Sequence, residues 1–93
     1  MSEPAKAEGE FVVASKLGLH ARPAGRFASL AGRYEAEISV SRSDEWVDAR
    51  SVLSLLSLAA GPGTRLRLRA VGADAEAAVR ALGQLLEESS EPG

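Results

Sequence analysis

The sequence predicts an α/β fold of the α+β type, an open-faced two-layer sandwich in which three helices cover one face of a four-stranded antiparallel sheet. Three observations indicate this. Some segments alternate apolar and polar residues, others repeat apolar residues at helical spacing, and together they follow the order β-α-β-β-α-β-α. Helices and a sheet with one apolar face each bury these faces against one another, while an antiparallel sheet can leave its other face in water.

The first half of the chain contains two strands and one helix. Residues 11–14 form a short apolar run that indicates a buried strand. A helix of about three turns follows, ended by Gly32, and its buried stripe is Ala24, Phe27, Ala28 and Ala31. Residues 36–41 then alternate apolar and polar side chains, as a half-buried strand does.

The second half adds two strands and two helices. Residues 46–49 can return as a hairpin partner after a turn at 41–44. Ser51 is a good N-cap for a short apolar helix over 52–60, which Gly-Pro-Gly at 61–63 stops. Residues 64–70 alternate again, and Asp74 can cap a last helix with the buried stripe Ala78, Leu82, Leu85 and Leu86.

The length of 93 residues supports one domain. We expect a flexible N-terminal extension over residues 1–9, a domain over 10–88 and a flexible tail over 89–93. The first ten residues are polar and contain no apolar signal-peptide core, and no apolar run approaches the roughly 20 residues that span a bilayer. These features predict a cytoplasmic protein with no membrane insertion.

Composition argues against several classes of site. The chain has no cysteine and one histidine, so we expect neither disulfides nor a metal site, and no cofactor. A net charge of −2 without a clustered basic excess argues against nucleic-acid binding. Arg65, Arg67 and Arg69 form a basic stripe on one strand, which we interpret as a solvated sheet face partly neutralised by Glu35 and Glu37.

The single histidine, His20, is the candidate chemical residue. A helix that begins near Ala21 makes His20 its N-cap, where the positive helix end favours a neutral, nucleophilic ring and would later stabilise a phosphate on it. Arg22 adds a second positive group, and Pro23 is tolerated in a first turn. In the alternative interpretation, Gly18 and Pro23 mark only a turn and a helix start, and Arg22 is a solvated side chain.

The second helix has more apolar residues than one stripe of a short helix buries: Val52, Leu53, Leu55, Leu56 and Leu58. Either this helix is deeply packed, or it exposes an apolar patch of the kind that marks a partner interface. We predict that Leu53 and Leu56 are partly exposed and that Val52 and Leu55 are more buried. A phosphate on Ser51 would also be stabilised by the helix end, so this N-cap could serve as a switch.

Two runs resemble the signatures of the HPr family, the histidine-containing phosphocarriers of the bacterial phosphotransferase system (PTS). GLHARPA at 18–24 is similar to the active-site signature, and DARSVLSLL at 48–56 to the signature around a regulatory serine. Their spacing and AAGPGT at 59–64 also fit, over about residues 10–88. The resemblance implies that His20 accepts a phosphoryl group on Nδ1 from phosphorylated enzyme I and passes it to an enzyme IIA component.

The same resemblance implies roles for other residues. Arg22 would hold the phosphate, and Ser51 would be modified by an HPr kinase/phosphorylase. The partner-docking residues would be Ala21, Ala24, Phe27, Leu53 and Leu56. The protein would be a monomer and a stoichiometric phosphocarrier rather than a true catalyst.

The chain also departs from the family pattern. Leu17 stands where many members have Ser or Asn, so phosphate binding would rely on backbone N–H groups and Arg22. Ser54 replaces a glycine of the second signature. Two other functions compete with the carrier: a regulatory docking module of the same fold, and an acylphosphatase-like hydrolase, against which the absence of asparagine counts.

Overall fold

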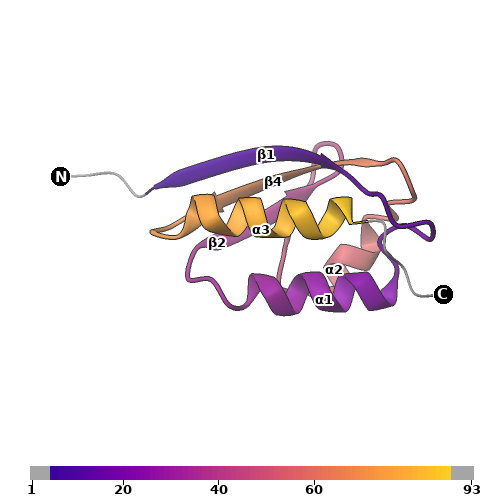
Figure 1. The fold of residues 1–93 in the computed structure, drawn as a ribbon, viewed down its shortest axis with the longest axis horizontal. Coiled ribbons are helices and arrows are strands. Elements are labelled where there is room, and N and C mark those ends of the chain that lie inside the picture. Colours follow the sequence, from indigo (N-terminus) through magenta and orange to yellow (C-terminus); the bar gives the residue numbers. More distant parts are fainter. Residues whose placement is uncertain (1–4, 89–93) are drawn as a thin grey trace.

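The computed structural model describes residues 5–88 and has the predicted element order (Figure 1). The elements are β1 (Lys6–Val12), α1 (Ala21–Ala31), β2 (Glu37–Ser41), β3 (Trp46–Asp48), α2 (Val52–Ser57), β4 (Arg65–Val71) and α3 (Ala75–Glu87). The four strands form one antiparallel sheet in the order β1-β4-β2-β3, and the helices lie together on one side of it. Within the described residues, no helix has the length and apolar character to cross a membrane.

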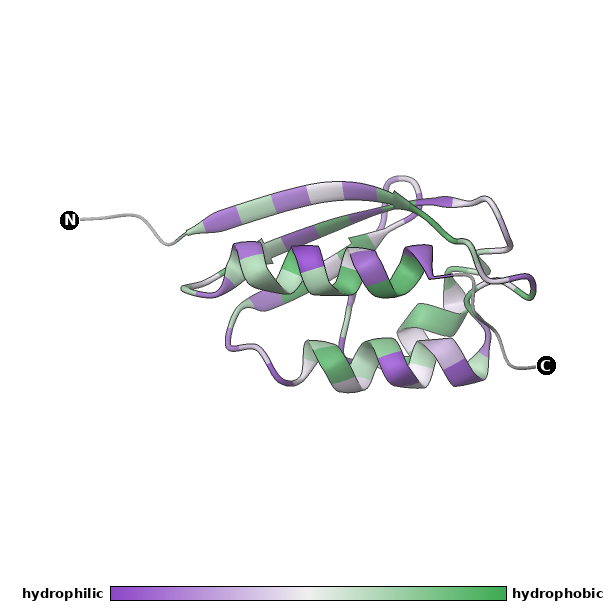
Figure 2. Ribbon diagram, viewed as in Figure 1, coloured by the Kyte–Doolittle hydropathy of each residue, from purple (hydrophilic) through white to green (hydrophobic). Residues whose placement is uncertain are grey.

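The core lies between the sheet and the helices. Leu66, Leu68 and Ala70 of the central strand β4 are fully buried, while the arginines between them are exposed, and this alternation is visible in Figure 2. The predicted stripe of α1 is also buried: Ala24, Phe27, Ala28 and Ala31. In α3, three of the four predicted residues are buried, and Leu85 packs partly against the core.

The first strand corrects two predictions. It begins at Lys6, so residues 6–9, which we expected to lie in a flexible extension, pair with β4. It is an edge strand with one open face, and Val12 is therefore 41% exposed rather than buried. On its covered face the ring of Phe11 occupies the space beside Gly83 that an added Cβ would need. Residues 1–4 and 89–93, the remainder of the predicted flexible ends, lie outside the described residues.

The helix α2 is shorter than predicted. We expected it to continue to residue 60, but it ends at Ser57 with Leu58 as its C-cap. The chain then reverses through Ala59, whose φ of 52° lies in the left-handed region. This reversal places the carbonyl of Ala60 against the loop that precedes α1.

Asp74 is the N-cap of α3 by position, but its side chain does not cap the helix. Its carboxylate instead accepts hydrogen bonds from the backbone N–H groups of Glu35 at 2.9 Å and Ala36 at 2.8 Å. The bond from Glu35 is the main cause that lowers the pKa of Asp74 from its usual value. Asp74 thus holds the start of β2 to the start of α3.

Candidate functional site

His20 is the N-cap of α1, as predicted. Its backbone is extended, with φ −88° and ψ −169°, and its carbonyl accepts the first helical hydrogen bond, from the N–H of Ala24 at 2.9 Å. Its side chain makes no capping hydrogen bond, and the first turn of α1 holds no acidic residue. The positive end of this eleven-residue helix is therefore not neutralised locally, and it can bind an anion.

His20 is partly exposed as a residue, and one of its ring nitrogens is covered. Nε2 is buried and has no hydrogen-bond partner within the described residues. The residue as a whole has an intermediate exposure, and Nε2 does not contribute to it because that atom is buried. The other ring nitrogen, Nδ1, is thus the better candidate for a nucleophile.

Glycine is required in the loop that presents His20. Gly18 has a φ of +74°, and a Cβ built on it would lie 2.5 Å from the carbonyl oxygen of Ala60. Next to it, the N–H of Leu19 donates to that same oxygen at 2.8 Å, and the N–H of His20 donates to the carbonyl of Gly18 at 3.0 Å. The histidine therefore stands on a loop that is fastened to the turn after α2 (Figure 1).

Arg22 lies in the first turn of α1 and is exposed. Within residues 5–88 its guanidinium makes no hydrogen bond and no ion pair, whereas Arg26, one turn later, pairs with Glu88 at 3.5 Å. A free guanidinium two residues after the histidine can turn toward an anion at the helix end without breaking another contact.

Ser51 caps α2 as predicted. Its Oγ accepts a hydrogen bond from the N–H of Ser54 at 3.1 Å. Leu53 is 81% exposed and Leu56 is half-buried, which confirms that part of this helix faces solvent, and Leu55 is fully buried. The prediction for Val52 is wrong, because it is 36% exposed. A helix of six residues has few positions that face the core, and Leu55 occupies one of them.

Two of the predicted docking residues are not at the surface. Ala24 is fully buried and Phe27 is 1% exposed, because both belong to the inward stripe of α1. The prediction that these two residues contact a partner directly is therefore wrong. Ala21 is exposed, in agreement with a docking role. Leu17, which was predicted only as a departure from the family pattern and not as a docking residue, is an apolar residue that is 72% exposed in the loop before His20. Its departure from the family pattern was the one signal that could have singled it out.

The basic stripe of β4 has different partners from those predicted. In the register of the sheet, Glu8 lies opposite Arg69 and Glu10 opposite Arg67, both from β1. Glu37 instead lies opposite Val71, and Glu35 precedes β2. The indole of Trp46 adds a further contact, because the guanidinium of Arg69 lies 4.0 Å and that of Arg67 5.0 Å from its ring centroid. On the open sheet face the arginines of β4 therefore lie among acidic residues of β1 and against the indole of Trp46.

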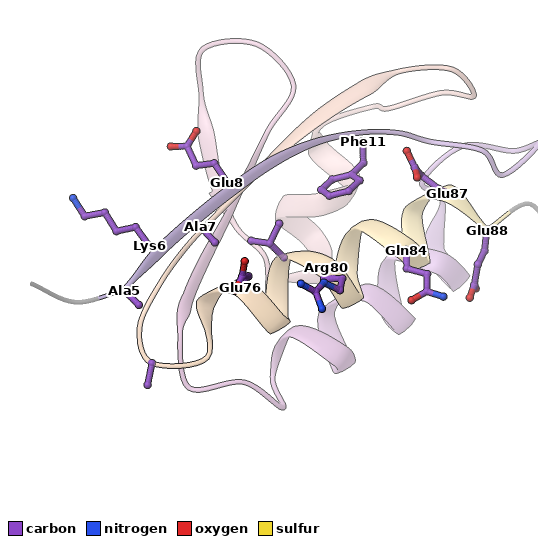
Figure 3. Close-up of a pocket in the computed structure, with 12 residues that line it drawn as sticks. Ala5, Lys6, Ala7, Glu8, Phe11, Glu76, Arg80, Gln84, Glu87 and Glu88 are labelled. Carbon is purple, nitrogen blue, oxygen red and sulfur yellow. The ribbon is translucent and has the colours of Figure 1, made fainter.

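A groove lies elsewhere, between the edge strand β1 and α3 (Figure 3). Phe11 and Val79 form part of its floor, and polar side chains of α3 such as Glu76, Arg80 and Gln84 line its side. None of the predicted site residues borders it. The groove is therefore separate from the residues that the sequence predicts to carry the chemistry.

Comparison with known proteins shows which family this chain belongs to. The PTS-HPr family model, described as the PTS HPr component phosphorylation site, matches residues 7–88. The chain belongs to the HPr family. The HPr-family members to which it is similar include the phosphocarrier protein HPr of Pseudomonas aeruginosa, 40% identical over 85 residues that cover 90% of this chain and 94% of the relative. The phosphocarrier protein NPr of Shewanella violacea is 40% identical over 82 residues, which cover 88% and 90%.

A solved structure shows the same HPr architecture. The crystal structure of the phosphocarrier protein HPr from Bacillus anthracis matches with a TM-score of 0.85 at 35% identity, over 88% of this chain and 98% of that one. Both the family and the four-stranded open sheet with three helices are therefore confirmed. In general terms, the chain is a phosphocarrier-family protein of the PTS.

Proposed function

We propose that His20 accepts a phosphoryl group from phosphorylated enzyme I and passes it to an enzyme IIA component. The observation that supports this most is the partly exposed His20 at the N-terminus of α1, with Nε2 covered. In the forward step the lone pair of Nδ1 attacks phosphorus, a P–N bond forms, and the bond from phosphorus to the donor breaks. In the second transfer the P–N bond breaks, the phosphoryl group passes to the enzyme IIA component, and the free imidazole is regenerated.

The charge of the bound phosphate is balanced by groups of this chain. The unpaired amides at the start of α1 and the positive end of its dipole face the N-cap, where the phosphate would lie. The free guanidinium of Arg22 supplies a further positive charge. Since the side chain of Leu17 has no polar atom, we expect these groups to replace water around the phosphate.

The docking surface in this proposal is apolar and combines residues of α1 and α2. It consists of Leu53 and Leu56 from α2 and Ala21 from α1. Leu17 and Val52 are also exposed, and we include them in this surface. α2 packs against α1, and it lies beside the N-terminal part of α1 that follows the histidine (Figure 1). All the groups required belong to one chain, which supports a carrier that acts as a monomer.

Ser51 is the proposed regulatory site, to be phosphorylated by an HPr kinase/phosphorylase. Its side chain is partly exposed and stands at the start of the helix that bears Leu53. A phosphate on Oγ would place negative charge beside an apolar surface and weaken docking by desolvation and repulsion.

The exposed apolar face of α2 also favours a second candidate, a regulatory module that acts by docking alone. Incubation with enzyme I and phosphoenolpyruvate, followed by mass spectrometry, separates the two. The carrier gains one acid-labile phosphate that is lost in His20→Ala, whereas a docking module binds partners and gains none.

A further inference from the structure

The turn after α2, residues 58–60, adopts a conformation that its sequence disfavours. Ala59 has a φ of 52°, and it is the only non-glycine residue with a positive φ between residues 5 and 88. For a residue with a Cβ, this left-handed conformation persists only where the surrounding contacts impose it. Contacts with neighbouring residues must therefore keep Ala59 in this conformation.

Arg42 makes the contacts that hold this turn. Its Nη1 donates to the carbonyl of Leu58 at 3.0 Å and to the carbonyl of Ala59 at 3.1 Å. The cation lies at the C-terminal end of α2, where the helix dipole favours positive charge. Arg42 itself follows the end of β2 directly, and the buried Ser41 before it donates from Oγ to the carbonyl of Ser43 at 3.1 Å. The side chain of Arg42 therefore extends from a backbone segment that the end of β2 and the hydrogen bond of Ser41 fix in place.

The same turn supports the loop that presents the histidine. The carbonyl of Ala60 accepts the N–H of Leu19 at 2.8 Å, and the missing Cβ of Gly18 allows close approach to the same atom. The N–H of His20 in turn donates to Gly18 at 3.0 Å. A displacement of residues 58–60 would thus change the position of Leu19 and, with it, the backbone from which the imidazole extends.

We propose that Arg42 is a positioning residue for His20, acting through the left-handed turn at Ala59 and the hydrogen bond between Leu19 and Ala60. Arg42 is exposed and does not belong to the hydrophobic core, so its loss should loosen the loop without unfolding the domain. Only the kinetic consequence of the inference rests on the proposed phosphocarrier function.

Hydrogen exchange of single amides tests the structural part. In Arg42→Ala, exchange at the Leu19 amide should accelerate about 10-fold, as expected for the loss of one charge-assisted hydrogen bond. Exchange at Leu68, in the middle of β4, should change much less. Arg42→Lys should restore most of the protection, and Arg65→Ala, an exposed arginine of the same sheet, should leave Leu19 as it is. Unchanged exchange at Leu19, or an equal acceleration at Leu19 and Leu68, would overturn the proposal.

A second variant tests the route through Ala59. Glycine adopts a positive φ without strain, so a turn with Ala59→Gly needs less support from Arg42. The effect of Arg42→Ala on Leu19 exchange should therefore be several-fold smaller in the Ala59→Gly background. An equal effect in both backgrounds would show that Arg42 does not act by holding this residue.

The reaction supplies an independent measurement. Because the chain has one histidine, its imidazole resonances are unambiguous, and they should shift in Arg42→Ala but not in Arg65→Ala. Phosphorylation by enzyme I should slow several-fold in Arg42→Ala and recover in Arg42→Lys. A wild-type rate despite an altered loop would refute the role of Arg42 in the reaction. If the wild-type protein accepts no phosphate, the proposed function fails, while the exchange and resonance data still decide whether Arg42 positions the loop.

Discussion

The backbone N–H of Leu19 donates to the carbonyl of Ala60 at 2.8 Å, and this single bond joins the histidine loop to the turn that follows the serine-capped helix. The two residues are far apart in the sequence but meet at one end of α1 and α2. A nucleophile at a helix N-terminus must be held with little freedom if an incoming phosphoryl group is to find it in line. The hydrogen bond between Leu19 and Ala60 contributes to that restraint.

Replacement of His20 with alanine should abolish phosphate acceptance and leave the fold intact. The side chain makes no capping bond, so the loss of stability should be below the roughly 1 kcal/mol of an ordinary N-cap. Mass spectrometry after treatment with enzyme I, together with a melting curve, checks both statements. Full phosphorylation of the variant would place the acceptor elsewhere.

Replacement of Arg22 with alanine should slow phosphotransfer by about 10-fold and change the affinity for enzyme I less. A charge-assisted contact is worth roughly 1.5–3 kcal/mol, and the exposure of this side chain favours the lower end. Arg33→Ala, just beyond the other end of α1, is the matched control and should transfer at the wild-type rate. Equal losses of rate and affinity in Arg22→Ala would identify it as a docking residue instead.

Glutamate at positions 53 and 55 should have opposite effects. Leu53 is 81% exposed, so Leu53→Glu should fold normally and bind enzyme I weakly. Leu55 is fully buried, so Leu55→Glu should lose several kcal/mol of stability, on the scale of the whole stability of a small domain. Thermal unfolding and titration with enzyme I measure the two effects. Wild-type affinity of the Leu53 variant would remove this residue from the docking surface.

Substitutions at Ser51 should separate its role as the N-cap of α2 from its proposed role as a regulatory site. Ser51→Asp keeps an acceptor for the N–H of Ser54 and should preserve stability, while Ser51→Ala loses that bond and about 1 kcal/mol. Only the aspartate should slow transfer from enzyme I, and added salt should reduce the difference. If both variants transfer at the wild-type rate at low salt, Ser51 is a helix cap and nothing more.

Asp74 should make the stability of the protein depend on pH in the acid range. Its pKa is lowered below the ordinary 3.8 by the hydrogen bonds from Glu35 and Ala36, so the carboxylate stabilises the folded state above that value. The stabilisation should be lost as the pH falls from about 3.8 through the lower pKa of the folded state. The free energy of unfolding, measured in urea, should be larger for the wild type than for Asp74→Asn near neutral pH. The two values should converge in acid. A constant difference at all pH values would contradict this role.

The sequence by itself determined the order of the elements, the buried stripe of α1, and the positions of His20 and Ser51 as N-caps. These features depend on nearest neighbours and on the period of the helix or strand, which are local properties of the chain. The tertiary structure decided the rest. Lys6 to Gly9 form a strand only because β4 offers an edge, and Asp74 binds N–H groups that the fold brings to it. Val52 is exposed because a helix of six residues turns few positions to the core. Ala59 takes a left-handed backbone where α2 ends, beside a hydrogen bond from the distant Arg42, and such a contact leaves no periodic signal in the sequence.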